Sequence, residues 1–438
     1  MTDFHGMLIV LGALGLLIAV LAFLRRVTRI SGEVSRKAVH IGMGCITVTF
    51  PWMFEKSWPV GLLALIAGGV IASLSLVPSL NSVLKDVGRK TLGEIYFPIS
   101  VAFAFHYSSG DPVLYCPPIL MLTFGDALAA LVGNRYGKQM FTTHDGKKSW
   151  EGSVAFVIAT FVTTAVSLVI LTDYSLIKIS LIAMLLGTIG FMIEGFAWKG
   201  LDNLFVPVFG LVAMQAFHDL EVGALTVRML VVIGMITFCF ALKKRSTMKD
   251  GTLFGAALFL YAIWAIAGWV WVLPPLLVFL LFTRVVRIDL RKFQNYQSVT
   301  SLICINAVSF FWLSQSMRAD ESNPYFWPFA AAFAIHLSMI WSKRAKAEKQ
   351  SHHVLFAAFL YPLIAIVIVQ ALPAAILGLA IDWEFGRAVA GSYFACAAIS
   401  LVVVFVGRYG FGTEVGLEEW GFRIVLAMIG SLGTFWLV

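Results

Sequence analysis

The stretch FGDALAALVGNRYGKQMFTTHDGKKSWEGS, residues 124 to 153, places polar side chains between two apolar segments. Asp126 lies within a run from 112 to 133 that is long enough to cross a bilayer. An ionisable residue at that depth costs free energy unless it has a partner or a task. We therefore expect the functional site to lie in this stretch.

Basic residues and glycines follow Asp126 in this stretch. A new apolar segment begins directly after Glu151, and helix starts with exposed amide groups beside lysines favour phosphate. Glycines let a backbone approach a ligand closely. The residues in question are Lys138, Lys147, Lys148, Gly133, Gly137 and Gly152. A basic, glycine-containing loop between membrane helices is also common without any binding role, so spacing alone leaves both interpretations open.

The composition excludes a soluble globular protein. Hydrophobic residues make up 60% of the 438 residues, charged residues only 13%, and the mean hydropathy is +0.88. We predict an all-α, polytopic bundle of about sixteen membrane spans in two halves, residues 1–242 and 243–438. The spans are expected near 7–24, 38–54, 58–79, 92–107, 112–133, 152–171, 176–193, 201–218, 224–241, 253–271, 273–284, 299–316, 324–341, 353–372, 388–406 and 421–438.

Charge placement predicts the orientation of this bundle. The net charge of +8 is spread over loops, with no basic block interleaved with aromatic residues, which argues against nucleic-acid binding. Most Lys and Arg residues fall in alternate loops, as the positive-inside rule requires. Four polar clusters then share the cytoplasmic ends of their helices, and we expect one site there. These clusters are residues 31–44, 85–94, 126–152 and 194–207.

The motifs in these clusters resemble a known family. GDALAALVGxxxGK followed by KSxEGS is similar to the signature of the CTP-dependent polyprenol kinases, which include phytol, farnesol and dolichol kinases. ExxRKxxHIxxG from Glu33, TLGEIYFP at 91–98 and LDNLFVP at 201–207 also resemble family segments. The resemblance covers about residues 31 to 215, and it is more distantly shared with the CDP-diacylglycerol synthases.

The resemblance implies phosphoryl transfer from CTP, with Mg²⁺, to a lipid alcohol such as phytol, geranylgeraniol or a polyprenol. Carboxylates, lysines and glycine turns are the parts that this chemistry needs. The implied catalytic residues are Asp126, Glu151, Glu194 and Asp202, of which Asp126, Glu194 and Asp202 are the metal ligands. The implied nucleotide-binding residues are Arg36, Lys37, Lys138, Lys147, Lys148, Gly133, Gly137 and Gly152. His40, Glu94 and Asn203 are expected to orient groups or bind substrate.

Two other functions fit the same features. A cytidylyltransferase that forms a CDP-lipid needs similar groups, and a transporter also needs many spans and a membrane aspartate. No GxxxxGK[ST] loop is present, so an ordinary ATP cradle is excluded. The carboxyl-terminal half distantly resembles the phytyl-phosphate kinase family. We expect that half to be catalytically degenerate, because every acidic residue after Lys243 is predicted to lie in a loop.

Overall fold

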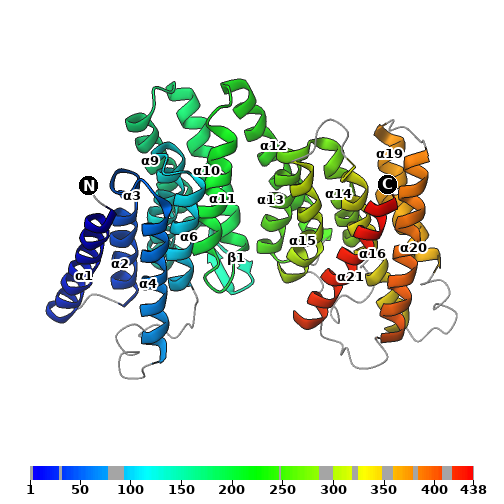
Figure 1. The fold of residues 1–438 in the computed structure, drawn as a ribbon, viewed down its shortest axis with the longest axis horizontal. Helices are drawn as coiled ribbons and strands as arrows, with labels where there is room; N and C mark the ends of the chain where they lie inside the picture. Colours follow the sequence, from blue (N-terminus) through cyan, green and yellow to red (C-terminus); the bar gives the residue numbers. More distant parts are fainter. Residues whose placement is uncertain are drawn as a thin grey trace. The chain divides into compact units, whose positions relative to one another are not determined.

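The computed structural model describes residues 3–28, 32–76, 93–245, 248–285, 299–317, 324–347, 359–377, 383–406 and 417–437. Its contacts divide the chain into two compact units, Met1–Val231 and Val232–Val438. This division passes through α12 (Val222–Ala241), eleven residues before the end of the first half that the sequence predicts. Figure 1 shows the helices of both units.

The first unit is built from helices and one β-hairpin. Each of the nine spans predicted for residues 1–242 overlaps a helical segment of the structure, because apolar runs of this length satisfy their backbone groups only as helices. The elements are α1 (Asp3–Val27), α2 (Gly32–Thr47), α3 (Phe50–Met53), α4 (Ser57–Leu76), α6 (Gly93–Tyr107), α7 (Pro112–Leu120), η1 (Met121–Asp126), α8 (Ala127–Tyr136), β1 (Met140–Thr143), β2 (Gly146–Ser149), α9 (Trp150–Leu171), α10 (Leu176–Phe196) and α11 (Asp202–Phe217).

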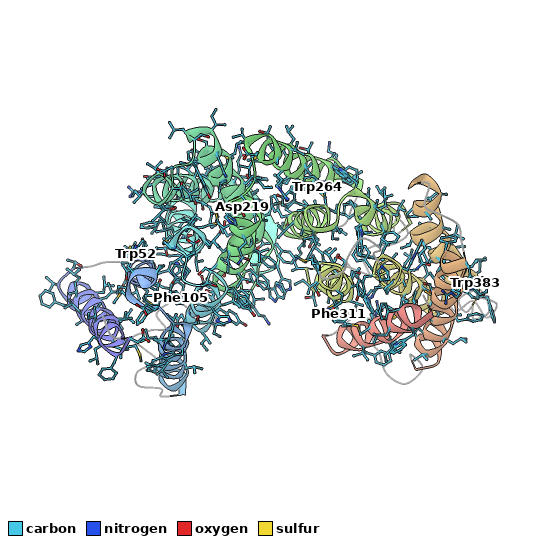
Figure 2. All side chains as sticks on the ribbon, turned by 45° about the horizontal axis from the view of Figure 1, so that its top comes forward. Trp52, Phe105, Asp219, Trp264, Phe311 and Trp383 are labelled. Carbon is cyan, nitrogen blue, oxygen red and sulfur yellow. The ribbon has the colours of Figure 1, made fainter. Side chains whose placement is uncertain are left out.

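The described residues contain eight helices that are long and apolar enough to cross a membrane, together with shorter apolar helices of 10–17 residues. Large apolar side chains face outward, as a lipid-facing surface requires: Trp52 is 62% exposed and Trp383 is 77% exposed, whereas Phe105 is buried (Figure 2). The predicted all-α membrane bundle is confirmed. The predicted count of about sixteen spans is not confirmed.

Glycines bring α8 and α9 into backbone contact. A Cβ added to Gly152 would lie 2.7 Å from the carbonyl oxygen of Ala129 and 3.1 Å from the Cα of Gly133. A Cβ on Gly137 would lie 2.7 Å from the Cβ of Ser149, the residue before α9. These glycines therefore serve helix packing, in which small residues let two membrane helices approach closely.

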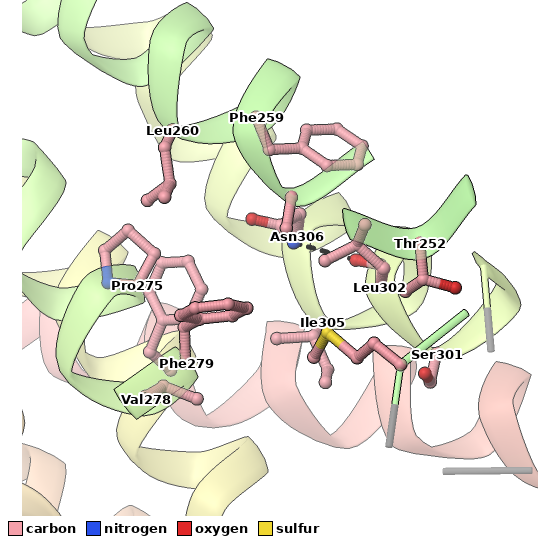
Figure 3. A pocket seen from close by; sticks show the side chains of 13 residues that line it. Thr252, Phe259, Leu260, Pro275, Val278, Phe279, Ser301, Leu302, Ile305 and Asn306 are labelled. Carbon is pink, nitrogen blue, oxygen red and sulfur yellow. Dashed lines mark hydrogen bonds between the residues drawn. The ribbon is translucent and has the colours of Figure 1, made fainter. Parts of the chain in front are cut away.

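The second unit is helical in all its described parts. Its elements are η2 (Lys243–Arg245), α13 (Asp250–Ala267), α14 (Trp269–Val285), α15 (Val299–Ser316), α16 (Phe326–Ala347), α18 (Tyr361–Ile366), η6 (Val367–Ala371), α19 (Leu372–Leu377), α20 (Trp383–Val406) and α21 (Leu417–Leu437). A mostly apolar pocket lies between α13, α14, α15 and α16 (Figure 3). Thr252, Ser301 and Asn306 are its polar lining residues, and the Asn306 side chain donates to the Leu302 carbonyl oxygen at 2.8 Å.

The expectation that every acidic residue of this half lies in a loop was wrong. Asp250 begins α13, is only 4% exposed and pairs with Lys243 at 2.5 Å between Nζ and Oδ1. Glu384, Glu418 and Glu419 also lie within helices, in the first turns of α20 and α21. Asp289, Asp320, Glu321, Glu348, Asp382 and Glu414 lie outside the described residues.

We predict that adding a methyl group at the contact between α8 and α9 destabilises the protein. Gly152→Ala should lower the free energy of unfolding by about 1–3 kcal/mol, because its Cβ meets backbone that cannot move aside. The matched control is Gly61→Ala within α4, where an added Cβ would have no atom within 4 Å. Thermal unfolding of the detergent-solubilised protein measures both, and an unchanged midpoint for Gly152→Ala would contradict the packing described here.

Candidate active site

Two side chains of α2 meet Asp126 inside the first unit. Lys37 Nζ donates to Asp126 Oδ2 at 2.5 Å, and His40 Nε2 lies 3.6 Å from the same oxygen. Lys37 is 3% exposed and the Asp126 side chain is 16% exposed. Because an unpaired charge in an apolar bundle is costly, this pair stabilises the approach of α2 to the acidic helix.

Asp126 lies at the end of a π-helical turn. Pro117 and Pro118 near the end of α7 lack backbone donors, and η1 follows directly with a wider helix of six residues. Helices α2 and α9 pack closely against this turn. A Cβ on Gly44 of α2 would overlap the Thr123 side chain, and a Cβ on Gly125 would lie 2.9 Å from the Phe156 ring of α9. The turn thus aims the carboxylate toward α2, where the Leu122 carbonyl oxygen also lies 3.3 Å from His40 Nε2.

A second ion pair joins the hairpin to the end of α10. Lys148 Nζ donates to Glu194 Oε1 at 3.0 Å and to the Glu194 carbonyl oxygen at 2.7 Å. The Glu194 side chain is 9% exposed, and its other oxygen, Oε2, is buried without a hydrogen-bond partner. A buried carboxylate oxygen without a donor is costly, so this atom is suited to receive a cation or a donor from a ligand.

Electrostatics link the two pairs into one cluster. Burial disfavours the ammonium form of Lys148, but the carboxylates of Glu194, Asp202 and Asp126 outweigh burial and raise the pKa of Lys148 above its usual value. The raised pKa keeps the positive charge in place at neutral pH. The stability that the charged Lys148 contributes through these carboxylates is lost as the pH rises through the raised pKa of Lys148.

The start of α11 completes the cluster. Asp202 accepts the backbone N–H of Asn203 through Oδ1 at 3.1 Å. Asn203 lies against the start of α6, since a Cβ on Gly93 would be 2.6 Å from its Nδ2. Glu94, the next residue of α6, is exposed. The structure therefore brings together residues from three of the four predicted clusters: Lys37, His40, Asp126, Lys148, Glu194, Asp202 and Asn203.

Lys147 and Lys148 point to opposite sides of the hairpin. Successive strand residues alternate in direction, and Lys148 pairs in register with buried Phe141, whereas Lys147 pairs with exposed Thr142. Lys147 is itself exposed. It therefore lies on the face turned away from the Lys148–Glu194 pair, which the sequence pattern KK did not reveal.

The remaining predicted residues lie around the cluster. Arg36 and Lys138 are exposed. The Glu151 carboxylate accepts the backbone N–H of Gln139 at 3.1 Å and so fastens the base of the hairpin. Gly133, Gly137 and Gly152 pack α8 against α9 and Ser149. Among the described residues, no three His, Cys, Asp or Glu side chains lie close enough together to hold a metal ion.

A double-mutant cycle tests the buried pair. Lys37→Met should lower the free energy of unfolding by about 3–5 kcal/mol, because it leaves the Asp126 carboxylate buried without its partner. Lys37→Met combined with Asp126→Asn should recover most of that loss. Thermal unfolding in detergent measures both variants. Equal destabilisation of the single and double variants would show that the pair does not form.

Comparison with known proteins finds relatives that are named phytol kinases. The phytol kinase of Synechocystis sp. is 32% identical over 200 residues, covering 44% of this chain and 84% of that protein. Proteins named probable phytol kinase 2, chloroplastic, are 24% identical in Glycine max over 150 residues and in Oryza sativa subsp. japonica over 164 residues. Those matches cover 34% of this chain and 51% and 54% of the plant proteins. No family model and no solved structure matches. The identity and coverage of the Synechocystis protein show that this chain belongs to the phytol kinase family.

Proposed function

We propose that the protein is a membrane kinase that transfers a phosphoryl group from CTP to an isoprenoid alcohol. The observation that carries the proposal is that two lysine–carboxylate pairs, Lys37–Asp126 and Lys148–Glu194, interact electrostatically within one apolar helix bundle. Phosphoryl transfer needs positive groups for phosphates and carboxylates for metal and proton. The relatives named phytol kinase support the class of acceptor.

Lys37 and Lys148 are suited to bind the phosphates of the nucleotide. An ammonium group has three donors, and the contacts described use only part of that capacity. Both lysines are held by carboxylates before any ligand arrives, so little side-chain entropy remains to be lost on binding. The choice of CTP rests on the motif resemblance.

The carboxylates fit a magnesium site that is completed by phosphates. Mg²⁺ is usually bound by one or two carboxylates together with substrate phosphate oxygens. Glu194 Oε2 is buried without a partner, and Asp126 and Asp202 lie within electrostatic reach of Lys148. Asp126 with Glu194 or Asp202 would hold the ion, which would neutralise charge on the transferred group. Two carboxylates are enough for such a site because phosphate oxygens supply further ligands.

The proposed reaction breaks one P–O bond and forms another. The alcohol oxygen attacks the γ-phosphorus, the bond between that phosphorus and the β-phosphate oxygen breaks, and CDP leaves. The alcohol proton passes to a carboxylate, for which Asp126 is placed beside His40. Lys148 precedes α9, Glu194 lies near the end of α10 and Asp202 begins α11, so an alcohol head could reach these groups while its isoprenoid chain stays in lipid.

Labelled nucleotide tests this function directly. Purified protein in lipid nanodiscs, given CTP labelled at the γ-phosphate, should transfer label to phytol or geranylgeraniol, and Asp126→Asn should retain less than about a tenth of the activity because a metal ligand contributes several kcal/mol. The matched control is Asp219→Asn, whose side chain is 86% exposed. Transfer from α-labelled CTP instead would indicate a CDP-lipid product. No transfer with any nucleotide and alcohol would exclude the kinase.

The cytoplasmic placement of the site makes a separate prediction. In a Cys45→Ser background, a cysteine at exposed Asn134 should react with an impermeant maleimide only from the cytoplasmic side, and one at exposed Asp173 only from the opposite side. Labelling in right-side-out and inverted vesicles measures this. Reaction of both positions from one side would contradict the orientation.

A further inference from the structure

The tip of the β-hairpin is joined to the loop between α10 and α11. The Asp145 carboxylate accepts the backbone N–H of Lys199 through Oδ2. The rings of His144 and Trp198 lie beside each other with centroids 5.7 Å apart. These residues are 54 positions apart and belong to none of the motifs that predict the site. We name this contact, between residues 144–145 and 198–199, the tip latch.

The loop side of the latch is held in an uncommon conformation. Lys199 has φ +53°, a region that residues with a Cβ rarely occupy, and Gly200 follows with φ +82°. Gly200 also packs against the start of α6, where a Cβ on Gly93 would lie 3.3 Å from its Cα. A left-handed lysine persists only where surrounding contacts determine it. The Asp145 carboxylate is one of those contacts.

The same loop separates two carboxylates of the active site. Glu194 lies at the end of α10, and Asp202 begins α11. The hairpin on the other side of the latch carries Lys148, which pairs with Glu194. The latch therefore connects the hairpin that carries Lys148 to the loop between the two helices that carry Glu194 and Asp202.

The hairpin needs such fastening because its strands have only four residues each. An isolated two-stranded hairpin is marginally stable in water. Its base is fixed to α9, where the Trp150 N–H donates to the Gln139 carbonyl oxygen at 2.9 Å and the Phe141 and Trp150 rings lie 5.2 Å apart. The tip, in contrast, is exposed and extends away from that base. Lys148 lies near the middle of this span.

We propose that Asp145 is a positioning residue for nucleoside triphosphate binding, acting through the tip latch to hold Lys148 over Glu194 and Asp202. This role rests on the proposed function. Loss of the latch should weaken capture of the donor phosphates more than the transfer step, since the reacting carboxylate Asp126 lies on a different element.

Asp145→Ala and Asp145→Asn separate the hydrogen bond from the charge. Asp145→Ala removes the acceptor, and the KM for CTP should rise about tenfold while kcat changes less than about threefold. Asp145→Asn keeps a carbonyl oxygen that can accept the Lys199 N–H, so its KM should stay within about threefold of the native value. Asp173→Ala, the same change at an exposed loop residue, is the matched control and should have native kinetics. An unchanged KM in Asp145→Ala, or an equal rise in both Asp145 variants, would overturn the role.

Hydrogen exchange supplies a readout that does not need activity. Amides of Gly146–Ser149 should exchange faster in Asp145→Ala than in the native protein and Asp145→Asn, because hairpin opening becomes easier. If the native protein shows no phosphoryl transfer, the proposed function fails and this exchange still decides the latch. Equal exchange in all variants would overturn the latch itself. Faster exchange together with native kinetics would overturn its positioning role.

Discussion

The architecture of the first unit depends on the ion pair between Lys37 and Asp126. Both groups lie within an apolar bundle, where neither charge is tolerated alone. The pair therefore requires α2 and the α7–η1–α8 segment to lie side by side, although 89 residues separate the partners. The arrangement of the acidic turn, the packing of Gly44 on Thr123 and the position of His40 all follow from that contact.

The sequence predicted the helices well because their signal is local. Apolar runs of membrane length define α9, α10 and α12 almost to their ends. Asp126, inside the run 112–133, and Glu194, just after the run 176–193, were predicted as site residues because they are ionisable groups at those positions. The partners of these charges depend on tertiary packing. The motif resemblance brought Lys37 and Lys148 into one predicted site, but only the fold shows that Lys37 pairs with Asp126 and Lys148 with Glu194.

Other features of the structure could not be predicted from the sequence pattern. Residues 140–149 carry no run of alternating apolar residues, so the hairpin, and with it the opposite directions of Lys147 and Lys148, was not predicted. The close approach of two helix backbones at Gly133 and Gly152 was also not predicted, because it depends on how α8 and α9 pack in three dimensions. Asp250 was placed in a loop because hydropathy does not show that a carboxylate at a helix start can be buried beside a lysine.

The π-helical turn has a consequence for how the chain tolerates change in length. An α-helix advances about 100° per residue, so η1 inserts a phase shift between the apolar face of α7 and the face of α8 that packs on α9. Removal of one residue between Met121 and Asp126 would close the wide turn to a regular α-helix and leave α7 and α8 nearly in phase, because an i→i+5 turn holds about one residue more than an α-helical turn. Removal of one residue from the regular helix on either side would instead rotate the two parts by about 100°, so that either Tyr115 and Ile119 would leave the core or the Asp126 carboxylate would turn away from Lys37. The wide turn is thus the place in this segment where the loss of one residue would disturb the packing least.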